Sequence, residues 1–194
     1  MAGRGAPTGI LLAAGASRRF GSAKLAVPLA DGTPLGVASC RALRAALGRV
    51  FAVVRPEDDT LAALLADRGA HIVRCARAED GMGASLACGV AASADADGWI
   101  VALADMPWIA PATIRAVADA IAAGASLAAP FHHGERGHPV GFAPGHREAL
   151  MALTGDEGAR ALVAHAGAAL VRIDVDDPGV LRDVDLPRDL ASPG

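Results

Sequence analysis

The chain has 194 residues, a length that suits one α/β domain with a core of its own, and we predict a single domain over residues 1–194. Apolar residues make up 53% of the chain but aromatic residues only 3%, so alanine and aliphatic side chains must build the interior. A net charge of −3 gives no reason to expect a nucleic acid or a membrane surface as a partner.

Cysteine usage and the N-terminus both bear on the compartment. Cys40, Cys75 and Cys88 are odd in number and lack C-x-x-C spacing, which favours small buried side chains in a reducing compartment over metal ligands or disulfides. The first residues lack the basic start and long apolar segment of a signal peptide, and Gly15 ends the early apolar run far short of a membrane span. We therefore expect a soluble cytoplasmic protein.

The first predicted element is a buried strand over residues 10–13, followed by a loop over residues 15–24 that is rich in glycine and basic residues. Glycines let the backbone aim successive N–H groups at one point, and cations beside such a concavity suit a polyphosphate. A plain strand-to-helix connection is the alternative. We favour phosphate binding because glycines and cations recur together directly after a buried strand. The loop matches neither G-x-G-x-x-G nor the Walker A pattern, in which Lys24 would come two positions late.

Strands and helices then alternate along the chain. The pattern predicts a helix from about residue 35 to 48, a strand over 51–54, a helix around 61–65 that closes at 69, and a strand over 70–73. Such alternation is typical of βαβ units and a parallel sheet.

A second glycine-bearing loop, residues 81–86, opens a helix that we expect to run to about residue 93. Spacing alone makes a plain glycine-rich connection at least as good an interpretation as a binding site. Ser85 lies near the start of this helix and is a candidate first-turn capping residue.

The most clearly buried strand, residues 99–104, ends on Asp105. An acidic side chain at the carboxyl end of a parallel strand lies where open α/β sheets bind ligands. One carboxylate there can supply an oxygen to Mg²⁺, which takes waters and substrate phosphates as its other ligands. The alternatives are a turn residue or the cap of the helix that begins near Pro111, and the position of Asp105 favours the metal.

The last third of the chain is less regular. Two extended segments, 127–130 and 138–142, flank a polar loop and predict a hairpin over the sheet edge. The histidines of this region, His132, His133 and His138, match no zinc spacing, so a metal role for them is disfavoured. Asp156 is a plain N-cap for the helix that it opens, and the last strand is expected near residues 169–173.

The first loop closely resembles the opening signature of the nucleotidyltransferases that make molybdenum cofactor dinucleotides, L-A-[AG]-G-x-x-x-R-[FM]-G-x-x-K. The matching residues are Leu12, Ala13, Ala14, Gly15, Arg19, Phe20, Gly21 and Lys24. The form with two alanines is similar to the cytidylyltransferase branch of the MobA-like NTP transferases. We therefore predict a three-layer αβα domain with a mainly parallel, Rossmann-like sheet and an antiparallel hairpin.

The resemblance covers almost the whole chain and implies roles for further residues. Segment 81–86 is similar to the family's G-M-[GS]-x-S-L, which lies against the nucleoside, so Gly83 and Ser85 are candidates to contact base or ribose. Asp105 lies in an L-A-D-M-P motif, and residues 183–190 resemble D-[IV]-D-T-P-E-D-L, with Leu186 and Arg188 departing from the usual Thr and Glu. By this resemblance Asp185 is the partner of Asp105 on the metal.

The acceptor side of the site is also implied by the resemblance. Arg136, His138 and Pro139 fall in a segment similar to the family's R-G-x-P-V-x-F, which is expected beside the pterin. Asp156 belongs to a G-D-E-G-A-R run that is similar to another family stretch of the same region.

The activity implied by the resemblance is transfer of CMP from CTP to the terminal phosphate of molybdopterin, with release of pyrophosphate. Arg19 and Lys24 would neutralise the triphosphate, and backbone N–H groups near Gly15 would hold it. Residues 12–15 would bind the nucleotide, and Mg²⁺ would bind Asp105 and Asp185. The expected catalytic residues are Arg19, Lys24 and Asp105. Alanine at position 14, where guanylyl-transferring relatives carry glycine, favours CTP over GTP.

Three alternatives remain open at this point. They are a GTP-dependent molybdopterin guanylyltransferase, a sugar- or alditol-phosphate cytidylyltransferase, and a non-catalytic carrier that delivers the molybdenum cofactor to an apo-molybdoenzyme. Retention of both Asp105 and Asp185 disfavours the carrier, because a carrier has little use for a metal-bridged triphosphate. An apo-molybdoenzyme as a further partner fits either the enzyme or the carrier.

Overall fold

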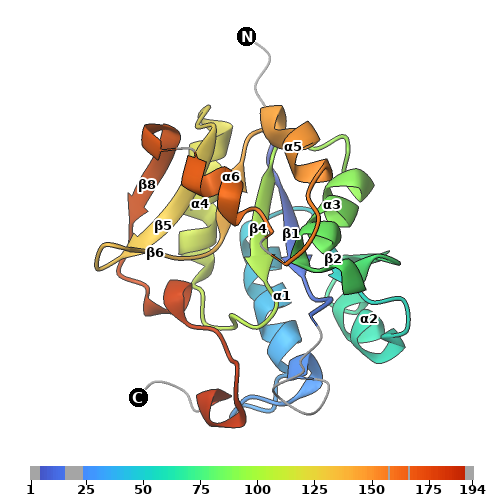
Figure 1. Ribbon diagram of the computed structural model, residues 1–194. Helices are drawn as coiled ribbons and strands as arrows, with labels where there is room; N and C mark the ends of the chain where they lie inside the picture. The colour runs from blue at the N-terminus through green and yellow to red at the C-terminus, as the bar shows by residue number, and fades with distance from the viewer. Residues whose placement is uncertain (1–4, 16–23, 157, 166, 191–194) are drawn as a thin grey trace.

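The computed structural model describes residues 5–15, 24–156, 158–165 and 167–190. Figure 1 shows helices packed on both faces of a central sheet. The strand order is β3-β2-β1-β4-β7-β5-β6, and β8 pairs with β5. The strands are β1 (Thr8–Leu12), β2 (Val50–Val54), β3 (His71–Arg74), β4 (Trp99–Leu103), β5 (Leu127–His132), β6 (Glu135–Arg136), β7 (Val140–Phe142) and β8 (Leu170–Asp174).

The sheet is mainly parallel, as the sequence predicted. Strand β1 pairs in parallel with β2 and β4, and Leu12 lies opposite both Val53 and Leu103. Three carboxyl ends therefore meet along one edge of the sheet, which is where the ligand site is expected. Strand β8 is parallel to β5, whereas β7 runs antiparallel to both of its neighbours.

The helices form two layers. They are α1 (Leu35–Ala46), α2 (Asp59–Ala66), α3 (Met82–Ala92), α4 (Pro111–Ala122), α5 (Arg147–Met151) and α6 (Arg160–His165), with short 3-10 turns between elements. Apolar side chains of α1, α2 and α4 belong to one buried cluster, and those of α3, α5 and α6 to a second one. Neighbouring strand residues alternate between the clusters, with Leu11 in the first and Ile10 in the second, so the sheet is covered on both faces.

A buried carboxylate fixes the C-terminal segment beside the end of β4. Asp177 accepts hydrogen bonds from the Ala110 N–H at 2.9 Å and the Thr113 hydroxyl at 2.6 Å, which are both at the start of α4. A side chain at Gly179 would collide with the carbonyl of Trp108, so only glycine allows this approach. The contacts hold the following residues, up to Asp185, near the end of β4.

Three features of the middle and end of the chain differ from what the sequence predicted. The two predicted extended segments do pair antiparallel, as β5 and β7, but β7 lies inside the sheet between β4 and β5 and not over its edge. Strand β5 also forms a short antiparallel pair with β6. Helix α6 begins at Arg160, four residues beyond Asp156, so Asp156 does not cap it. Helix α5 was not predicted at all, because its five residues are too short to show a helical period.

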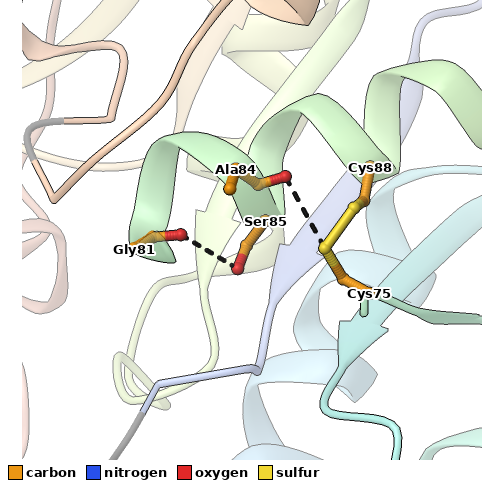
Figure 2. Close-up of a disulfide and its surroundings, with 5 residues drawn as sticks. All are labelled: Cys75, Gly81, Ala84, Ser85 and Cys88. Carbon is orange, nitrogen blue, oxygen red and sulfur yellow. Dashed lines mark hydrogen bonds between the residues drawn. A yellow bond between two sulfur atoms is a disulfide. The ribbon is translucent and has the colours of Figure 1, made fainter. Parts of the chain in front are cut away.

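The expectation for two of the cysteines was also wrong. Cys75 and Cys88 form a disulfide (Figure 2), whereas Cys40 is buried and free as predicted. Cys75 follows β3 and Cys88 lies in α3, and packing of the helix on the sheet brings their Cα atoms to 5.9 Å across a sequence separation of 13. No spacing pattern in the sequence predicts the disulfide between Cys75 and Cys88, because tertiary packing brings the two residues together.

No helix within the described part of the chain has the length and apolar character needed to cross a membrane.

Candidate active site

Four charged side chains meet at the carboxyl end of β4. Lys24, which begins a 3-10 turn (Lys24–Ala26), places its ammonium 2.9 Å from Asp105 Oδ2 and 3.8 Å from Asp185 Oδ1. It also donates to the Val184 carbonyl at 2.7 Å. The Lys24 side chain is only 11% exposed, against 25% for Asp105 and 50% for Asp185. The structure thus brings together the three residues that the sequence placed at the phosphate and the metal.

Asp183 is a third carboxylate of this group, and the sequence analysis did not assign it a role. Carboxylate oxygens of Asp105, Asp183 and Asp185 lie within 4.8 Å of one another, and we refer to these three residues as the carboxylate site. Burial, then the negative charges of Asp185 and Asp105, raises the pKa of Asp183. The D-V-D spacing could have pointed to Asp183, because residues two apart in an extended chain lie on the same face. Val184, between the two aspartates, faces the other way and is fully buried.

The carboxylate site has the composition of a divalent metal site. Carboxylate oxygens are hard ligands, which suit Mg²⁺, Mn²⁺ or Ca²⁺. Asp105 Oδ1 is buried and has no hydrogen-bond partner among the described residues, which leaves it available as a ligand. The residues present therefore fit a hard divalent cation.

The predicted nucleotide side of the site begins where β1 ends. Ala13 donates to the Val53 carbonyl, and Ala14 is 5% exposed, while Gly15 is exposed. Arg55, the first residue after β2, donates from Nε to the Ala14 carbonyl at 3.0 Å. Sequence motifs did not point to this cation, although it directly follows its strand, and Asp105 likewise lies two residues after β4. Arg19 lies outside the described residues.

The start of α3 is held by backbone contacts to residues 154–155. Gly83 donates to the Gly155 carbonyl at 2.8 Å, and a Cβ on Gly83 would lie 2.7 Å from the Thr154 carbonyl oxygen. Ser85 donates to the Gly81 carbonyl at 3.3 Å (Figure 2), so its hydroxyl does not cap a free N–H. Gly83 and Ser85 therefore have packing roles, and their contacts to a nucleoside stay predictions.

A cavity of about 720 Å³ lies beside β4, β7, α3 and α6, and we call it the β4–α6 cavity. Its walls are mainly apolar, and they include Leu12 at the end of β1, next to the nucleotide loop. The polar groups at the cavity are Arg136, His138, Asp156 and Arg160. Three of the four residues expected on the acceptor side thus meet here, and Arg160, from the same G-D-E-G-A-R run, is an addition.

His138 is held in place from its backbone. Its N–H donates to the Val180 carbonyl at 2.9 Å, and the bond to the fourth expected residue, Pro139, is cis. Burial of the imidazole and, secondly, the nearby charge of Arg136 lower the pKa of His138, so the ring is neutral at pH 7. A neutral imidazole offers one donor and one acceptor, which suits a polar heterocycle better than a bare anion.

Comparison with known proteins gives consistent matches. Residues 9–171 match the MobA-like NTP transferase domain. By sequence, the chain is 35% identical over 195 residues to the purine catabolism protein PucB of Bacillus subtilis (strain 168), covering 93% of this chain and 92% of PucB.

Among solved structures, Rv0371c from Mycobacterium tuberculosis H37Rv has a TM-score of 0.82 at 30% identity, covering 96% of each chain. A structure of Rv0371C in complex with manganese has a TM-score of 0.75 at 26% identity, covering 95% of this chain and 96% of that one. Molybdopterin-guanine dinucleotide biosynthesis protein A from Archaeoglobus fulgidus shares the fold, with a TM-score of 0.67 at 20% identity over 94% of each chain.

Proposed function

Because this chain belongs to the MobA-like NTP transferase family, we propose that it transfers CMP from CTP to the terminal phosphate of a molybdopterin-type acceptor, with Mg²⁺ as the cofactor. An acceptor oxygen forms a bond to the α-phosphorus of CTP while the bond to the β-phosphate breaks and pyrophosphate leaves. Such a reaction needs positioning and charge neutralisation rather than a covalent nucleophile.

The observation that carries this proposal is the convergence of Lys24 and the carboxylate site at the strand ends, next to the loop after β1. In this proposal Asp105 and Asp185 hold Mg²⁺, and the third carboxylate, Asp183, lies beside them. The ion supplies positive charge that offsets the negative charge of the triphosphate and of the leaving pyrophosphate. The manganese complex of Rv0371C supports a divalent ion in a protein of this fold.

The chain's own groups position the nucleotide in this proposal. Backbone N–H groups of Ala14 and Gly15 approach the nucleotide, since the Ala13 N–H is already bonded to the Val53 carbonyl, and Lys24 meets the phosphates. Arg19 is a second cation for the triphosphate. Arg55 fixes the direction of the Ala14 carbonyl, and so orients the peptide that follows it. The contact of Arg55 with Ala14 is in place before the substrate arrives, and such preorganisation lowers the cost of binding charge.

The β4–α6 cavity is the proposed acceptor site. Its volume of about 720 Å³ is within the range of small-molecule sites, and Leu12 links it to the nucleotide loop. Apolar walls suit the faces of a fused ring system, while Arg136, His138 and Asp156 supply hydrogen bonds and charge around it. The proposal of a molybdopterin-type acceptor is supported by this cavity and by the sequence motifs. The fold shared with the Archaeoglobus fulgidus protein is compatible with this proposal.

The preference for CTP rests on Ala14. Its side chain is buried at the end of β1, so its methyl group narrows the space there. A purine needs more room than a pyrimidine, and overpacking costs about 1–3 kcal/mol, which corresponds to a preference of about 5- to 160-fold. Replacement of Ala14 by glycine should therefore admit GTP.

The test is release of pyrophosphate from CTP or GTP with Mg²⁺ and molybdopterin, with sugar and alditol phosphates as alternative acceptors. We expect a higher kcat/KM for CTP than for GTP, and a smaller difference in Ala14→Gly. A preference for GTP would refute the cytidylyl assignment, and turnover with a sugar phosphate alone would refute the acceptor. No release with any acceptor would favour a carrier instead of an enzyme.

A further inference from the structure

We propose that Lys24 occupies the metal position until a nucleotide draws its ammonium away, so that nucleotide binding and metal binding at the carboxylate site are coupled through this one side chain. The inference rests on the proposed function, because it takes the carboxylate site as the metal site and Lys24 as a residue that meets the triphosphate. It adds an order of events: lysine leaves the carboxylates as the metal arrives.

The position of the ammonium is the first observation. Lys24 Nζ lies 2.9 Å from Asp105 Oδ2, 2.7 Å from the Val184 carbonyl oxygen and 3.8 Å from Asp185 Oδ1. A cation surrounded by oxygen atoms in this way takes the place of a divalent ion, which would bind the same oxygens at about 2.0–2.6 Å. Burial of the lysine side chain, 11% exposed, keeps water from screening its charge.

The Lys24 ammonium and a divalent ion repel each other when both are at the carboxylate site. An ion bound to Asp105 Oδ2 would lie against the ammonium that this oxygen already accepts from, and like charges at such a distance repel strongly when partly buried. Asp105 Oδ1 is different, because it is buried and has no partner among the described residues. It is the oxygen that an arriving ion can use before Lys24 has left.

The composition of the chain is an independent observation. Lys24 is the single lysine of the protein: the 18 basic residues are this lysine and 17 arginines. An ammonium is a compact charge on a flexible stem, whereas a guanidinium is a planar fork that pairs with two oxygens at once. Only the former resembles a metal ion in size and can move between carboxylates and phosphates. The chain thus carries its single lysine at the position where the proposed exchange requires this property.

The destination of the ammonium follows from its place in the chain. Lys24 is the residue that meets the phosphates in the proposed function, so a bound triphosphate comes within reach of its four-carbon side chain. Leaving the carboxylates costs little when phosphate oxygens replace them as partners, and the vacated oxygens then bind the metal. By linkage, the nucleotide raises the affinity for the metal by the same factor as the metal raises the affinity for the nucleotide.

The first experiment measures Mn²⁺ binding to the nucleotide-free protein, by the electron paramagnetic resonance signal of the free ion. Lys24→Met keeps the length of the side chain and removes its charge, and we expect it to bind Mn²⁺ at least about tenfold more tightly than the wild type. Arg74→Met is the matched control, because Arg74 pairs with Asp59 away from the carboxylate site, and its affinity for Mn²⁺ should equal that of the wild type. Lys24→Met/Asp105→Asn should lose the gain.

The second experiment uses the wild type, so it does not depend on the folding of a variant. Labelling with [¹³C,¹⁵N]lysine gives signals from Lys24 alone, because the chain has no other lysine. We expect the Cε and Nζ signals to stay near their starting positions with CTP absent and Mg²⁺ below saturation, and to shift when both are added. Asp105→Asn should already show shifted signals without ligands.

The outcomes separate this inference from the proposed function. Equal Mn²⁺ affinities of the wild type and Lys24→Met, or lysine signals that do not change with Mg²⁺ and CTP, would overturn the exchange and leave the transferase proposal intact. Failure of all forms to bind Mn²⁺, with and without CTP, would overturn both. Tighter binding in Lys24→Met and in Arg74→Met alike would trace the effect to net charge and would also overturn the exchange.

Discussion

The carboxylate site and the β4–α6 cavity lie at the same edge of the sheet but are built in opposite ways. Lys24, Asp105 and the segment Asp183–Asp185 come from three distant parts of the chain and are joined by ion pairs and hydrogen bonds. The cavity is formed mostly by apolar side chains of neighbouring strands and helices, with charged groups among its lining residues. The contrast indicates that changes at the carboxylates should alter the rate, and changes at the cavity should alter acceptor affinity and stability.

Loss of a carboxylate should give the largest effect. Asp105→Asn and Asp185→Asn are each expected to lower kcat by about 100-fold or more, since each removes a ligand from the metal that offsets transition-state charge. The double variant should be little worse than either single one, because both serve one ion. Pyrophosphate release measures the rates, and circular dichroism checks the fold. Near-normal turnover in either single variant would contradict the metal assignment.

Reduction of the disulfide should lower the free energy of unfolding but leave metal binding at the carboxylate site unchanged. The link between Cys75 and Cys88 closes a short loop that includes the start of α3, and closure of a loop of about 15 residues is worth about 3 kcal/mol. We expect urea denaturation to show a loss of that order in the wild type with a reducing agent. Cys75→Ala/Cys88→Ala should be insensitive to the reductant, and its affinity for Mn²⁺ should be unchanged. Equal stability of the oxidised and reduced wild type would refute this contribution.

A methyl group at Gly83 should disturb the packing of α3 beside the cavity. In Gly83→Ala the new Cβ would meet the Thr154 backbone, which cannot turn aside as a side chain can. Overpacking of this kind costs about 1–3 kcal/mol of unfolding free energy. Gly48→Ala is the control, because nothing lies within 4 Å of a Cβ at that position. Gly83→Ala should therefore unfold at a lower temperature than Gly48→Ala. Identical midpoints would show that α3 accommodates the methyl group without loss of stability.

The smallest expected effect is at Arg160, on the rim of the cavity. Arg160 is exposed, and exposed charges are well screened, so Arg160→Ala should raise KM for an anionic acceptor only about two- to fivefold. The effect should shrink at high salt, and KM for CTP should not change. Arg147→Ala, an exposed residue of α5 that does not line the cavity, gives the baseline. A change in KM for CTP instead would place Arg160 at the nucleotide.

Much of the framework could be predicted from the sequence because it depends on local patterns. Short apolar runs bounded by glycine or proline mark β1, β2 and β4, and helical spacing marks α1 and α4. The position of Asp105 after its strand followed from the same pattern, since parallel strands all end at one edge. The family motifs named Lys24, Asp105 and Asp185 in advance, and the structure brings these three together.

Other features depended on contacts between distant segments. The insertion of β7 into the sheet, the pairing of Cys75 with Cys88 and the hydrogen bond from Arg55 to Ala14 have no local signature. Each is decided by which elements pack together, and a sequence pattern of period two or 3.6 carries no information on partners.

The amino-acid sequence by itself determined the alternation of strands and helices, the location of the ligand site at the strand ends, and the residue types available there. Only the tertiary structure decided that Asp183 joins the carboxylates, that Lys24 lies among them, and that an apolar cavity opens next to Leu12. The physical reason is that charge pairing and cavity shape are properties of side chains brought together by folding, whereas strand and helix preferences are carried by neighbours in the chain.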